Sequence, residues 1–214
     1  MFDLHVFNFT ECPPEAFRLR YQIYVEEMER QQPYANHKSR TIIDPMDSSA
    51  HHGVAFADGK VAAVIRLNFV RDGGVDPYYT FYEINKLPLG TQDKISICTR
   101  NMVASAYRST PLAFRMLKLM YILALENGST ACYIDVNAPL VPMFEKIGCK
   151  PLFEKEHSDY GLVTVMRLDG LDLDHLISVR SPFVPICRKY LKRLERKGSA
   201  DFSDQAADLL PIST

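Results

Sequence analysis

Apolar side chains recur along the chain with a period of two in some segments, typical of strands, and at helical spacing in others. A short helix is expected at 79–87, inside an otherwise weakly patterned segment, 71–94. Asp58-Gly59 is a strong hairpin signal between two apolar runs. The expected strands are 2–9, 52–56, 60–70, 94–103, 131–136, 150–154 and 162–168, and the expected helices are 15–28, 111–127, 138–147 and 186–197.

The order of these elements predicts the fold class. Hairpins and crossover helices occur in one chain, which indicates an α/β (α+β mixed) fold with a mixed, mostly antiparallel sheet and helices on both faces. Residues 29–50 are polar and irregular, and a loop that long in a compact domain is usually functional. We expect one domain at 1–170, a basic helical extension at 171–197 and a disordered tail at 198–214.

Composition narrows the class of protein. The 214 residues carry a formal net charge of -1, which gives no support to nucleic-acid binding. The five cysteines are widely spaced without a CxxC pair, so neither a disulfide framework nor a zinc site is expected, and no metal. A reducing, cytoplasmic environment fits this pattern. The first residues lack a basic segment followed by an apolar one, so no signal peptide is expected.

The predicted helix at 186–197 is strongly basic. It carries six lysines and arginines against the single acid Glu195, and an apolar stripe runs along it. Such a helix suits an acidic partner, such as acyl carrier protein, or an anionic membrane surface with which the protein would be peripherally associated. The alternative is a solvated helix packed on the domain.

Three segments resemble the GNAT-fold acyltransferases. Residues 137–149, NAPLVPMFEKIGC, resemble the late helix of that family, and 108–113, RSTPLA, occupy the place of its pyrophosphate loop. The strand 97–103 takes the place of the family's fourth strand, which runs beside the donor thioester.

A dispersed signature resembles one branch of that fold, the acyl-homoserine-lactone synthases and the bacterial N-acyl amino acid synthases. In chain order its parts are Arg20 with Tyr24, Asp44 with Asp47, Arg66 with Leu67, and Thr99 with Arg100. The segment 20–27, RYQIYVEE, is close to a sequence of the second group. The chain also departs from these patterns: Ile97 replaces the signature's glutamate, Phe144 replaces a tyrosine that many GNAT enzymes use as general acid, and Pro111 replaces a loop glycine.

The resemblance implies where an acyl thioester would bind. A backbone N–H near Met102 or Val103 would stabilise the oxyanion, as in the GNAT fold. Amide groups at the start of the 111–127 helix would hold the donor's phosphates. The alternative for that segment is an ordinary turn between strand and helix. The expected donor-binding residues are Met102, Val103, Arg108, Ser109, Thr110, Leu112, Ala113 and Asn137.

The sequence offers fewer candidate catalytic groups than donor-binding residues. Asp44 and Asp47 could attract an ammonium group and relay its proton, or they could cap turns, which aspartate favours. Glu83 is a second candidate base, and His51-His52 a third. Thr99, Arg100 and Val103 complete the predicted catalytic set.

The arginines have two possible roles. Arg20, Arg66 and Arg100 fall on predicted helix and strand positions, where an unpaired charge is costly. They need carboxylate partners, and the resemblance pairs them with the two aspartates, which would hold the long loop on the sheet. The alternative is that one of them binds a substrate carboxylate. Tyr24 belongs to the same group, as core or as a wall of an acyl pocket.

The leading hypothesis is an N-acyltransferase that moves a medium or long acyl chain from acyl carrier protein or CoA to the amine of an amino acid or similar small molecule. One alternative is a conventional acetyltransferase that uses acetyl-CoA. The other is a non-catalytic module that binds acyl thioesters, which the replacements at Ile97 and Phe144 motivate. Lactone formation is less favoured, because nothing in the sequence indicates an adenosine pocket.

Overall fold

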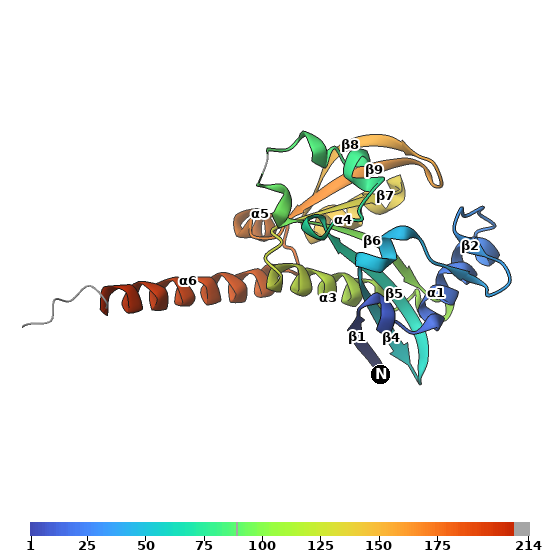
Figure 1. The fold of residues 1–214 in the computed structure, drawn as a ribbon, viewed down its shortest axis with the longest axis horizontal. Helices are drawn as coiled ribbons and strands as arrows, with labels where there is room; N and C mark the ends of the chain where they lie inside the picture. Colours follow the sequence, from blue (N-terminus) through green and yellow to red (C-terminus); the bar gives the residue numbers. More distant parts are fainter. Residues whose placement is uncertain (89, 208–214) are drawn as a thin grey trace, which may run out of the picture.

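The computed structural model describes residues 1–88 and 90–207, with side chains up to residue 196. One seven-stranded sheet of order β1-β4-β5-β6-β7-β9-β8 runs through it (Figure 1). The β6–β7 pair is parallel and every other neighbouring pair is antiparallel, which confirms the mixed, mostly antiparallel sheet. The strands are β1 Phe2–Phe7, β4 His51–Ala57, β5 Lys60–Phe69, β6 Ile95–Val103, β7 Ala131–Val136, β8 Cys149–His157 and β9 Gly161–Asp169, and a separate pair consists of β2 Ala35–Asn36 and β3 Thr41–Ile42.

Helices and short 3-10 turns connect the strands. The α-helices are α1 Pro14–Tyr21, α2 Tyr78–Phe81, α3 Leu112–Glu126, α4 Val141–Ile147, α5 Leu173–Ser178 and α6 Val184–Ala207. A π-helical segment, Gln22–Glu27, continues α1 directly. The 3-10 turns are Phe9–Glu11, Pro45–Ser49, Val70–Asp72, Ile84–Lys86, Gln92–Lys94, Ser105–Tyr107 and Ala138–Leu140.

The alternation of side chains along β5 supplies core contacts on both faces of the sheet. Ala63, Ile65 and Leu67 belong to the larger core together with α3, α4 and the start of α6. Val64 faces the other way and packs with α1. Because alternate side chains of β5 point to opposite faces, helices pack against both faces of the sheet.

The β6–β7 pair is short and then splits. Its register joins residues 95–97 of β6 to residues 131–133 of β7 and stops there. Beyond this point β6 contains a bulge, because Thr99 and Met102 lie opposite Arg66 and Val64, so three steps on β6 match two on β5. Arg100 takes up the extra residue with a left-handed φ of 58°. The bulge therefore lies on the part of β6 that no longer pairs with β7.

The C-terminal helix α6 begins in the core and then leaves the body (Figure 1). Phe183, just before it, stacks on Tyr121 of α3 with ring centroids 4.5 Å apart, and Cys187 is fully buried. Arg193 lies 3.9 Å from Glu126, the last residue of α3. Helix α6 thus runs along α3 in the same direction and passes its C-terminal end. None of the described helices is long and apolar enough to cross a membrane.

Several expectations differ from the structure in detail. The 29–50 loop contains the small β2–β3 hairpin and a 3-10 turn, and the final antiparallel pair is longer than predicted at both ends. The 171–197 extension is partly core, since Leu176 and Phe183 are fully buried. Helix α6 continues to Ala207, so the predicted disordered tail is helical up to that residue, and its remainder, 208–214, lies outside the described residues.

Candidate active site

A cleft of about 590 Å³ opens where β6 and β7 separate. Its walls come from the π-helical segment, the bulged half of β6, the end of β7 and α4. Many residues predicted from the sequence line it, namely Tyr24, Thr99, Arg100, Met102, Val103, Arg108, Ala113 and Asn137. The structure thus brings these predicted residues together around one cleft beside β6.

The backbone of Val103 turns into this open side. The N–H of Ala104 donates to the carbonyl of Ala62 on β5 over 2.9 Å. Along an antiparallel edge the residues alternate, so Val103 directs its N–H and C=O away from β5. The Nε of Arg108 donates to that Val103 carbonyl over 3.1 Å, which agrees with this orientation. No neighbouring strand covers β6 here, so the Val103 N–H faces the cleft.

The turn between β6 and α3 bonds mostly to itself. The amides of Tyr107, Arg108 and Thr110 donate to carbonyls within the turn, and the amide of Leu112 donates to the Thr110 hydroxyl over 3.3 Å. Arg108 forms an ion pair with Glu27. Ser109, Thr110 and Leu112 do not line the cleft, and Leu112 is fully buried. Four amides of the segment predicted to bind phosphates are therefore bonded within the turn, and Ala113 is the residue of the first helical turn that lines the cleft.

The parts of the dispersed signature meet in one buried ionic network. Asp47 is fully buried and accepts from Arg20 over 2.8 Å and from Arg66 over 3.0 Å. It also accepts the backbone N–H of Asp44 over 2.8 Å in a capping box at the 3-10 turn Pro45–Ser49. Asp47 thus ties α1, β5 and the long loop together.

Asp44 extends the network toward the cleft. Its Oδ1 accepts from Arg66 over 2.5 Å and its Oδ2 from Arg100 over 2.8 Å. Arg66 also donates to the Thr99 hydroxyl over 2.9 Å. Burial opposes the charge on Asp44, but Arg66 and Arg100 outweigh it and lower its pKa to about 2. A carboxylate held this way is a poor proton acceptor at neutral pH, so Asp44 is suited to ion pairing and not to proton transfer.

His52 lies inside the same network. Its Nδ1 is 3.2 Å from the Arg20 guanidinium, and its Nε2 is 3.0 Å from the backbone carbonyl oxygen of Asp47. Burial and then the charge of Arg20 lower its pKa to about 4, so the ring is neutral. Its Nδ1 accepts from Arg20 and its Nε2–H donates to the carbonyl. Both ring nitrogens are occupied by the fold, which leaves this histidine unavailable as a base.

Glu83 does not line the cleft. It pairs with Lys86 over 2.9 Å, and this hydrogen bond lowers its pKa. Asp135 at the end of β7 does line the cleft, and Tyr82 donates a hydrogen bond to its Oδ1. Burial raises the pKa of Tyr82, so that hydroxyl remains a donor. Asp135, Tyr160 and Arg30 also line the cleft and were not predicted from the sequence. For Asp135 one signal was present, an acidic residue at the end of a central strand.

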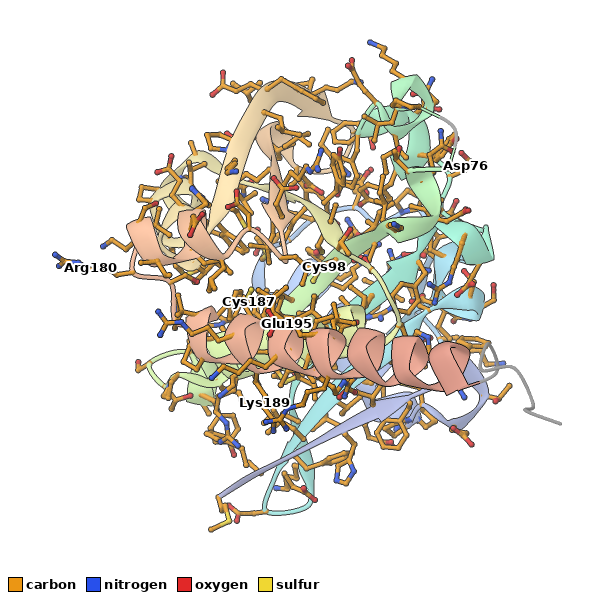
Figure 2. The ribbon with its side chains drawn as sticks, turned by 90° about the vertical axis from the view of Figure 1, so that its left-hand side faces the viewer. Asp76, Cys98, Arg180, Cys187, Lys189 and Glu195 are labelled. Carbon is orange, nitrogen blue, oxygen red and sulfur yellow. The ribbon has the colours of Figure 1, made fainter. Side chains whose placement is uncertain are left out.

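A small apolar cavity of about 40 Å³ lies on the α3 face of the split. It shares Cys98, Ile134 and Phe144 with the cleft, so these side chains separate the two spaces. Figure 2 shows Cys98 in the interior of the molecule. Its pKa is raised by the hydrogen bond that its thiol donates to Cys132 and by burial, so Cys98 is a buried thiol of the core.

The family model described as "N-acyl amino acid synthase FeeM" matches residues 15–169. The chain belongs to the N-acyl amino acid synthase family. It is therefore an N-acyltransferase, and the matched range contains the ionic network, the bulge and the cleft. No curated protein matches the sequence.

Solved structures support the GNAT-type fold. An acyl-CoA N-acyltransferase from Pseudomonas aeruginosa is 20% identical with a TM-score of 0.59, over 78% of this chain and 99% of that one. The CoA-dependent acyl-homoserine lactone synthase MesI is 18% identical with a TM-score of 0.62, over 83% and 93%. The acyl-homoserine lactone synthase LasI is 13% identical with a TM-score of 0.62, over 79% and 90%. At these identities the likeness establishes the shared fold.

Proposed function

We propose that this N-acyltransferase moves a medium or long acyl chain from a carrier-bound thioester to the amine of an amino acid. The observation that carries the proposal is the split between β6 and β7, where the Val103 N–H faces a cleft large enough for a thioester and an acceptor. The family description supports an amino acid as the acceptor.

Acyl carrier protein is the preferred donor. CoA brings a pyrophosphate and a third phosphate, and the amides that could bind them are mostly bonded within the turn at 105–112. A carrier-bound pantetheine arm brings one phosphate, for which Arg108 and the free amide of Ala113 suffice. Donor binding is thus proposed for Met102, Val103, Arg108, Ala113 and Asn137.

The apolar cavity supports a chain longer than acetyl. The cleft and the cavity meet at Phe144, and the cavity walls are almost entirely hydrocarbon and sulfur. An acyl chain passing between β6 and β7 would enter it and bury apolar surface at about 25 cal/mol per Å². Flexible Met120 on the far wall can yield to a longer chain.

The chemistry needs few side chains. A neutral amine attacks the thioester carbonyl, the new C–N bond forms, and the oxyanion accepts the Val103 N–H. The C–S bond then breaks and the sulfur leaves as thiolate, which needs no acid because thiol pKa values lie near 8.5. Phe144 in place of a tyrosine is compatible with this route. We assign the amine's proton to Asp135, directly or through water.

The basic stretch of α6 is proposed as a contact for an acidic surface. Because α6 passes the C-terminal end of α3, its basic stretch lies about 20 Å from the helix start where the cleft opens. A carrier docked on α6 must therefore also reach the cleft mouth at Arg108. An anionic membrane is the second candidate for this surface.

Purified protein should be incubated with acyl-carrier and acyl-CoA thioesters of two to sixteen carbons and the twenty standard amino acids, and the products identified by mass spectrometry. N-acyl amino acids formed preferentially from the carrier and from longer chains support the proposal. Products from acetyl-CoA alone would replace it with a conventional acetyltransferase, and thioester binding without product would leave a non-catalytic module. The charge reversals Lys189→Glu and Lys192→Glu test α6, since a KM raised only for the carrier donor supports docking there.

A further inference from the structure

The ionic network beside the cleft contains more positive than negative charge. Among the described residues Arg20, Arg66 and Arg100 form ion pairs with only Asp44 and Asp47, and three charges against two leave an excess of one. His52 adds none, because its pKa is lowered to about 4 by burial and by Arg20. An uncompensated buried charge is costly, so an anion at this position would be bound favourably.

Arg100 is the member of the network that reaches the cleft. Its side chain is 8% exposed and lines the cleft wall. One terminal nitrogen donates to Asp44 over 2.8 Å, and the other donates to the Tyr160 hydroxyl over 2.9 Å and to Gln32 over 3.3 Å. Its Nε is buried and has no hydrogen-bond partner among the described residues. A buried N–H of a charged group without an acceptor is unusual, and it leaves the charge of Arg100 incompletely compensated.

Arg30 supplies a second positive charge at the same place. It lines the cleft and stacks on the Tyr160 ring, 5.1 Å from the centroid. Within the described residues it has no carboxylate within ion-pair distance, and it donates one long hydrogen bond of 3.4 Å to the backbone carbonyl of Asp159. Tyr160 thus has Arg30 over its face and Arg100 at its hydroxyl.

Asp135 adds a negative charge to the positive charges of Arg30 and Arg100 in the cleft wall. The His157 ring lies 4.4 Å from Tyr160 between ring centroids, and its pKa is lowered, mainly by burial. Asp135, Asp159, Arg100 and Arg30 all act on this ring electrostatically. Of these four groups, Arg30, Arg100 and Asp135 also line the cleft, so a zwitterion bound there would meet charges of both signs.

We propose that the guanidinium groups of Arg30 and Arg100 bind the α-carboxylate of the acceptor while Asp135 receives its amine, so that the enzyme selects amino acids over simple amines. This inference rests on the proposed acyl transfer and names the residues that decide its acceptor. An amine without a carboxylate would leave Arg30 without an anion and the network with its excess positive charge, and a site built to bind a polar group rejects the analogue that lacks it.

The test uses the best amino acid from the acceptor screen together with two analogues, its methyl ester and the amine formed by its decarboxylation. The ester's amine is a weaker base than that of the amino acid and the decarboxylated amine a stronger one, so together they bracket the effect of amine basicity. The wild-type protein should use the amino acid with a kcat/KM at least about a hundredfold above both analogues. Comparable values for all three compounds would overturn the proposal.

The variant Arg30→Gln should raise KM for the amino acid about tenfold and leave KM for the ester within a factor of two. Arg30→Lys keeps the charge and should recover part of the loss. Arg18→Gln is the matched control, because Arg18 is exposed, pairs with Glu15 and lies outside the cleft. An equal effect of Arg30→Gln on acid and ester would refute the carboxylate site. Failure of every amine to be acylated would instead refute the proposed function.

Discussion

Replacing Asp47 with asparagine tests whether this residue holds the fold together or moves a proton. The carboxylate has no solvent exposure and accepts hydrogen bonds from Arg20, Arg66 and the backbone of Asp44. Its removal would leave three buried arginines with one aspartate, and the excess charge would rise from one to two. Breaking a buried pair by removing one partner costs about 3–5 kcal/mol.

That loss is a large share of the total stability of a domain, about 5–15 kcal/mol. For a chain of this size it corresponds to a fall in Tm of about 6–20 °C. Urea and thermal unfolding followed by circular dichroism measure both quantities. Glu83→Gln is the control, because Glu83 and Lys86 form an exposed pair, which contributes little to stability. A loss below about 1 kcal/mol for Asp47→Asn, with kcat reduced a hundredfold, would refute the structural role and assign Asp47 to catalysis.

Three further predictions concern pH, the oxyanion and the acyl chain. The free energy of unfolding measured in urea should fall by up to about 3 kcal/mol between pH 6.5 and 4. In this range His52 takes up a proton in the unfolded chain but stays neutral in the folded protein, where its pKa is about 4. His52→Gln should flatten this dependence on pH. Val103→Pro removes the N–H without removing a bond to β5 and should lower kcat by about 10²–10³, whereas Val103→Ala should not. Phe144→Ala should join cleft and cavity and shift the preferred donor in a chain-length series toward longer chains.

The ionic network was predictable because its members differ from their surroundings in the sequence. Arg20, Arg66 and Arg100 lie on apolar elements, where an unpaired charge is costly, and the two aspartates follow in an irregular loop. Carboxylate partners for these arginines could be expected from charge alone. Which carboxylate pairs with which arginine depends on the register of neighbouring strands, which only the structure shows.

The bulge in β6 could not be predicted in the same way. One extra residue between Thr99 and Met102 changes no apolar pattern in the sequence. It nevertheless gives Arg100 a left-handed backbone conformation, next to the point where β7 separates from β6. Arg30 was missed because it lies in an irregular loop without periodicity. The amides of the 105–112 turn were expected to be free, and their internal hydrogen bonds depend on backbone geometry that Ser109-Thr110-Pro111 does not reveal.

The replacement of an acid by Ile97 has a physical counterpart on the neighbouring strand. Ile97 is fully buried and pairs with Tyr133 in the parallel register of β6 and β7. Asp135 follows Tyr133 by two residues, so it lies on the same face of β7, about 7 Å farther along and into the split. A carboxylate at position 97 would be buried among Tyr82 and Tyr133, where its charge would be costly. At Asp135 a carboxylate instead reaches the cleft and accepts the Tyr82 hydroxyl. The change at Ile97 therefore removes an acid from the core without removing one from the cleft, and Asp135→Asn should lower kcat while leaving the buried network and the stability it provides intact.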